Sequence, residues 1–145
     1  MNSKNRTWGE LTGGCRVSIV RLPSDETEHG IVTLALMFRN DSSATVLFPR
    51  SSLWFDYDFS VLTESGIAVP LTAFGKQQRE SLGVAAATVA EVATGKEYET
   101  TVELSRLYQL GEPGSYTVQA FKAFRDPSSH QFVTVASNHL KFEVR

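Results

Sequence analysis

The sequence has little cysteine and no long hydrophobic run, and each shortage excludes a class of protein. Cys15 is the only cysteine among 145 residues, so an intramolecular disulfide framework and an all-cysteine metal site are both excluded. The longest apolar-leaning run, residues 31–38, is far shorter than the roughly 20 residues of a membrane-spanning helix. We therefore expect no insertion into a membrane.

The sequence also lacks an excess of positive or negative charge. The chain has 14 Lys and Arg against 16 Asp and Glu, which gives a net charge of −2. A protein that binds nucleic acid electrostatically carries a basic face and a high isoelectric point. The balance therefore argues against nucleic acid as a partner.

The first residues lack the pattern of a secretory signal. Residues 1–6 are basic, but the polar residues 7–14 follow, where a signal peptide needs an apolar stretch of about 7–15 residues. The sequence of these first residues predicts a cytoplasmic protein. The alternative is an exported domain whose signal peptide has been removed. We expect an N-terminal extension over residues 1–14 and one domain over residues 15–145.

The apolar residues that are present recur with a period of two, which predicts strands rather than helices. Residues 31–39 are apolar on both faces, which is typical of a central strand. The sequence predicts an all-β protein, a single immunoglobulin-like antiparallel β-sandwich of about eight or nine strands. The candidate segments for these strands are residues 15–22, 31–39, 44–48, 55–63, 67–71, 84–93, 97–104, 115–124, 131–136 and 139–145.

Three segments are harder to assign. Residues 72–83 are polar and are expected to form a loop. Residues 84–93 could be a helix by their alanines or a strand by their valines, and we favour a strand that turns at residues 94–96 into a hairpin with the next strand. Residues 104–110 break the two-residue period and predict one short helical turn.

Two stretches resemble known families. The stretch from Leu104 to Val118, LSRLYQLGEPGSYTV, resembles immunoglobulin-like domains of bacterial exported proteins and the β-domain of deuterolysin-type metalloproteases. The front half, FRNDS followed by FDYDFSV, resembles the small β-sandwich of the intracellular proteinase inhibitors of bacilli. The deuterolysin signature, a helix with two histidines separated by a glutamate, is absent here, so the protease chemistry does not carry over.

The Pro-Gly-x-Tyr sequence within the first stretch predicts a structural corner. Pro113 and Gly114 make a turn, and Tyr116 follows at the start of a late strand. A tyrosine in this position can bury its ring and return its hydroxyl group to a nearby carbonyl, as in immunoglobulin-type sandwiches.

The residues that could carry catalysis or bind a metal form no recognisable set. His29, His130 and His139 show no ligand spacing, and solvated loop histidines are the expectation. The acidic turn over residues 25–30 lacks the full pattern of a calcium loop. Asp56 and Asp58 could act as an acid–base pair only in a pocket, and we expect both on the wet face of a hairpin. We expect no cofactor, no metal and no catalytic residue.

Aromatic and basic residues are the remaining candidates for binding. Trp54 and Trp8 could stack on a ligand, although packing within the domain is the favoured interpretation for Trp54. The expected loop over residues 72–83 would present Lys76 and Arg79. The sequence therefore predicts a non-catalytic interaction domain whose partner is another protein. The alternatives are a proteinase-inhibitor-like protein and a carbohydrate-binding module that uses the aromatic side chains.

Overall fold

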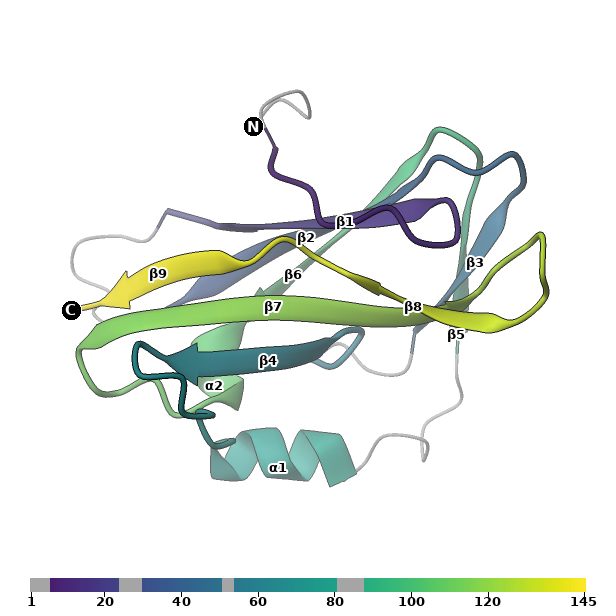
Figure 1. Ribbon diagram of the computed structural model, residues 1–145. Helices are drawn as coiled ribbons and strands as arrows, with labels where there is room; N and C mark the ends of the chain where they lie inside the picture. Colours follow the sequence, from purple (N-terminus) through teal and green to yellow (C-terminus); the bar gives the residue numbers. More distant parts are fainter. Residues whose placement is uncertain (1–5, 24–29, 51–53, 81–87) are drawn as a thin grey trace.

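A computed structural model describes residues 6–23, 30–50, 54–80 and 88–145. Within these ranges the chain forms an all-β sandwich with two short helices (Figure 1). The elements are β1 (Cys15–Arg21), β2 (Thr33–Asn40), β3 (Val46–Arg50), β4 (Asp58–Thr63), α1 (Ala73–Glu80), β5 (Thr88–Val92), β6 (Glu97–Glu103), α2 (Leu104–Leu107), β7 (Gly114–Arg125), β8 (Phe132–Ala136) and β9 (Leu140–Val144).

The described residues form three antiparallel sheets. One has the order β1-β2-β6, a second has β4-β7-β8 with β9 also paired to β7, and a third consists of β3 and β5. The first two sheets face each other, and the β3–β5 pair lies at one end (Figure 1). The prediction of a central strand over residues 31–39 is confirmed, because β2 lies between β1 and β6.

The core fills the space between the sheets with aromatic and branched side chains. The rings of Phe48 and Phe124 contact Phe38 edge to face, with ring centroids 5.2 and 5.5 Å from that of Phe38, a favoured arrangement for buried aromatic pairs. Cys15 is fully buried beside them. Burial raises the pKa of its thiol to about 12, with Asp41 and Asp126 adding to the effect.

The expected loop over residues 72–83 is wrong for most of its length, because residues 73–80 form α1. The Oγ1 atom of Thr72 accepts a hydrogen bond from the backbone N–H of Gly75 at 2.9 Å, as a helix N-cap does. Gly75 packs against α2, where a Cβ atom would lie 2.2 Å from the carbonyl oxygen of Leu107. The sequence of α1 shows no apolar stripe that would predict a helix, because Gly75 is the only residue that α1 buries.

The expected hairpin at residues 94–96 is also wrong. The turn is there, with Gly95 at φ 77°, but β5 pairs with β3 whereas β6 pairs with β2. Asn40 is fully buried at the end of β2. Its side-chain amide donates to the carbonyl groups of Ala44 and Val92, and it thereby ties the last residue of β5 to the end of β2.

The N-terminal residues from Arg6 to Gly14 fold back on the sandwich. The hydroxyl group of Ser18 on β1 donates to the carbonyl of Thr7, and the N–H of Gly9 donates to Val17. No helix among the described residues is long and apolar enough to span a membrane.

Candidate binding surface

The tyrosine corner has the geometry that the sequence predicts. Tyr116 is buried, and its hydroxyl group donates to the carbonyl of Glu112 at 2.6 Å. The stacked ring of Phe142 covers it. Pro113 and Gly114 are exposed in the turn. These residues lie at one end of the sandwich, where β7 begins (Figure 1).

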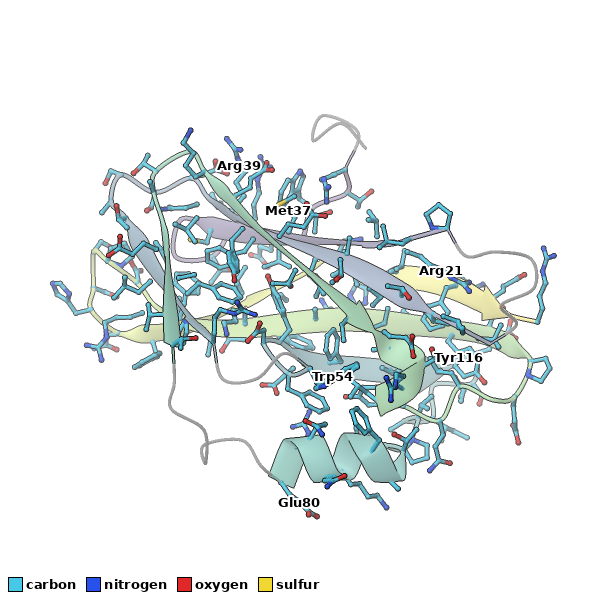
Figure 2. All side chains as sticks on the ribbon, turned by 180° about the vertical axis from the view of Figure 1, so that it is seen from behind. Arg21, Met37, Arg39, Trp54, Glu80 and Tyr116 are labelled. Carbon is cyan, nitrogen blue, oxygen red and sulfur yellow. The ribbon has the colours of Figure 1, made fainter. Side chains whose placement is uncertain are left out.

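The aromatic and basic candidates separate into two groups. Trp54 contacts Phe74 of α1 edge to face, with ring centroids 5.0 Å apart, and lies between β6 and α1 (Figure 2). Lys76 and Arg79 are exposed on α1 itself. Trp8 belongs elsewhere, because its ring lies under the guanidinium group of Arg16 on β1.

Cations cover the aromatic rings around α1. The guanidinium group of Arg106, from α2, lies 5.4 Å from the ring centroid of Trp54 and 4.9 Å from that of Phe74. Arg79 lies over Phe55 in the same way and is 3.6 Å from the exposed carboxylate of Asp58. We call Trp54, Phe74 and Arg106 the Trp54 cluster. It offers another molecule both positive charge and aromatic surface.

Asp56 is buried, contrary to the expectation that it lies on the wet face beside Asp58. Strand β4 begins only at Asp58, so the alternation of inward and outward side chains does not extend back to Asp56. The side chain of Arg50 donates to Asp56 Oδ2 through Nε and an Nη atom, at 3.1 and 3.0 Å. This ion pair is what permits a carboxylate to be buried here.

Lys122 of β7 forms a buried polar group together with Arg50 and Asp56. It is 6% exposed, and its ammonium group donates to the carbonyls of Pro49 and Asp56 and lies over the ring of Phe48. Burial lowers the pKa of Lys122 to about 8, and the nearby Asp56 partly opposes that shift. The lysine thus fastens the end of β3 to the segment that leads into β4.

A hollow of about 460 Å³ opens above this group, between the end of β3 and strand β6. Arg50 and Asp56 line one side, and the consecutive β6 residues Tyr98, Glu99, Thr100 and Thr101 line the other. Two of the residues that line it have a buried polar atom with no hydrogen-bond partner among the described residues: Asp56 Oδ1 and Thr100 Oγ1. Groups of this kind are costly unless something outside the chain binds them.

The edge of β6 that borders the hollow is open among the described residues. The hydrogen bonds from Asn40 N to Lys96 O and from Leu104 N to Val32 O fix the ladder with β2. In an antiparallel pair the bonded residues alternate, so Tyr98, Thr100 and Val102 bond to β2. The peptide groups of Glu99 and Thr101 therefore point away from it.

Sequence reasoning missed this edge and the hollow. The only available signal was the alternation in residues 97–104, which identified the strand but not its neighbours. Of the three histidines, His130 and His139 are exposed, and His29 lies outside the described residues, as does most of the acidic turn at 25–30. Within the described part of the chain, no three His, Cys, Asp or Glu side chains gather where they could hold a metal ion.

Comparison of the chain with models of known protein families and with curated proteins found no match.

Proposed function

We propose that the chain is a non-catalytic, immunoglobulin-like domain that binds another protein through the open edge of β6 and the adjoining Trp54 cluster. The observation that carries the proposal is the open edge, which runs along a hollow whose lining residues include buried polar atoms that lack partners among the described residues. Unpaired edges of this kind are the usual sites at which a strand from another chain is added.

The Trp54 cluster extends the same surface. Strand β6 runs directly into α2, whose Arg106 lies over Trp54 and Phe74. Figure 2 shows Trp54 just beyond β6 on this face of the molecule. Tryptophan and arginine are the side chains that most often dominate the energy of protein interfaces.

The same contacts favour a protein over a carbohydrate as the ligand. A sugar stacks on the open face of an aromatic ring, whereas arginine side chains lie over the rings of both Trp54 and Trp8. The guanidinium group of an arginine that lies over a tryptophan ring still has N–H donors and a positive charge with which a polypeptide partner can interact.

Site-specific photo-crosslinking tests the proposal. A photoreactive residue at Glu99, on the open edge, should crosslink one protein in cells of the organism that makes the chain. The same probe at the exposed Lys141 of β9, in the opposite sheet, is the matched control and should not. Equal crosslinking of the same protein from both positions contradicts the proposal.

Binding of the purified partner then tests the edge itself. Thr101→Pro removes a peptide N–H that points away from β2, and proline is tolerated at such positions of edge strands. Thr101→Ala keeps the N–H. We expect about tenfold weaker binding for the proline variant and unchanged binding for alanine. Equal binding by both, with circular dichroism showing both folded, overturns the proposed role of β6.

A further inference from the structure

The geometry of the hollow points to a specific kind of partner segment, an inference that rests on the proposed function. We infer that β6 accepts an extended segment that places an asparagine or glutamine side chain in the hollow. The same segment presents lysine or arginine side chains along the outer face of β6.

The backbone of β6 favours an extended segment. Its peptide groups at Glu99 and Thr101 point outward, whereas the side chains of Tyr98 and Thr100 turn toward the hollow. In a strand added beside β6, residues opposite Tyr98 or Thr100 direct their side chains to the same face. One inward side chain of the added strand therefore enters the hollow next to Thr100.

The polar atoms in the hollow select an uncharged side chain that both donates and accepts. Asp56 is 5% exposed, and its Oδ1 atom, without a partner among the described residues, needs a donor. The hydroxyl group of Thr100 can donate in return. Arg50 already pairs with the carboxylate of Asp56, and the ammonium group of Lys122 bonds to the backbone carbonyl of the same residue, so an additional cation would be repelled. A carboxamide supplies an N–H₂ donor and a carbonyl acceptor without charge.

The outward side chains of β6 set the charge of the partner segment. Glu97, Glu99 and Glu103 alternate along this face, and Glu99 has no ion-pair partner within the described residues. If β6 of a second copy paired here, glutamates would lie opposite or beside glutamates, which destabilises a strand pair. Basic side chains in the partner strand would instead complement this row.

Synthetic peptides test the inference by NMR titration of the intact chain. The first alternates lysine with valine and carries asparagine at the central inward position. In the second, valine replaces the asparagine, and in the third, glutamate replaces the lysines. We expect the first peptide to shift the amide resonances of Glu99 and Thr101 and to bind about tenfold more tightly than the second. The third should bind more weakly than the first.

Variants of the chain locate the contact. Thr100→Val removes a hydroxyl group that has no partner among the described residues, so stability should be kept while the asparagine peptide loses its advantage over the valine peptide. Thr101→Pro should weaken binding of both. Equal affinity for the asparagine and valine peptides, or tight binding that Thr101→Pro does not change, overturns the inference.

Failure of this inference is distinguishable from failure of the proposed function. If the peptides do not bind but the probe at Glu99 still crosslinks a protein whose binding Thr101→Pro weakens, the chemistry assigned to the segment is wrong and the binding domain stands. If neither the peptides nor the crosslinking succeeds, both are overturned.

Discussion

Gly75 of α1 lies so close to Leu107 of α2 that a Cβ atom on the glycine would be 2.2 Å from the leucine carbonyl oxygen. The two short helices therefore touch backbone to backbone. This contact holds α1 next to Trp54, because Phe74 and Arg106 reach the tryptophan from α1 and α2 respectively.

Gly75→Ala should destabilise the chain by about 1–3 kcal/mol, since an added methyl group forces packed backbone apart. Gly111→Ala is the matched control, because nothing lies within 4 Å of the Cβ position there. Urea unfolding of both variants measures the difference. Equal stability of the two would show that α1 does not rest on α2 as described.

Tyr116→Phe and Tyr57→Phe should differ in their effects on stability. The hydroxyl group of Tyr116 donates a hydrogen bond to the carbonyl of Glu112. Removing this hydroxyl group should lower the free energy of unfolding by about 1 kcal/mol. Tyr57 OH is buried without a partner among the described residues, so removing it should be neutral or stabilising in the unbound chain. Thermal unfolding of the two variants measures the contrast, and a larger loss for Tyr57→Phe would contradict it.

Lys122 should make the chain more stable as the pH rises above about 8. Burial lowers the pKa of Lys122 in the folded state to about 8, against 10.5 for an ordinary lysine. Between these values the unfolded chain holds a proton that the folded chain has released, so the free energy of unfolding increases with pH in this window.

Side-chain NMR of Lys122 and unfolding at several pH values check this prediction. We expect a titration midpoint near 8 for Lys122 and a smaller rise in stability for Lys122→Met. A midpoint at or above 10.5 would show that the ammonium group is not held in the buried position described. This measurement uses the unsubstituted chain, so it does not depend on whether Lys122→Met folds.

Local patterns predicted most strands but little of the binding surface. Strands such as β2, β7 and β9 follow from alternation, because each buries one or both faces. Helix α1 was missed because its main packing contact is made by a glycine, which carries no hydrophobic signal. The end of β5 is bonded to Asn40, whose buried amide reaches a carbonyl 52 residues away, and local alternation contains no sign of such a contact.

The hollow could not be predicted, because it depends on residues that the fold brings together from far apart. Asp56 lies in an alternating run that places it with exposed Asp58. Its partners in the buried position, Arg50 and Lys122, come from two different sheets. The open edge of β6 depends on the order of the strands in the sheet. Alternation within one strand contains no information about that order.

Amide hydrogen exchange along β6 tests the open edge most directly, and needs no partner. We expect slow exchange at Tyr98 and Thr100, whose N–H groups bond to β2. We expect fast exchange at Glu99 and Thr101, whose N–H groups point away from β2. Protection of Glu99 and Thr101 as strong as that of Thr100 would mean that the edge is already covered in the free chain. That result would contradict the proposed binding site.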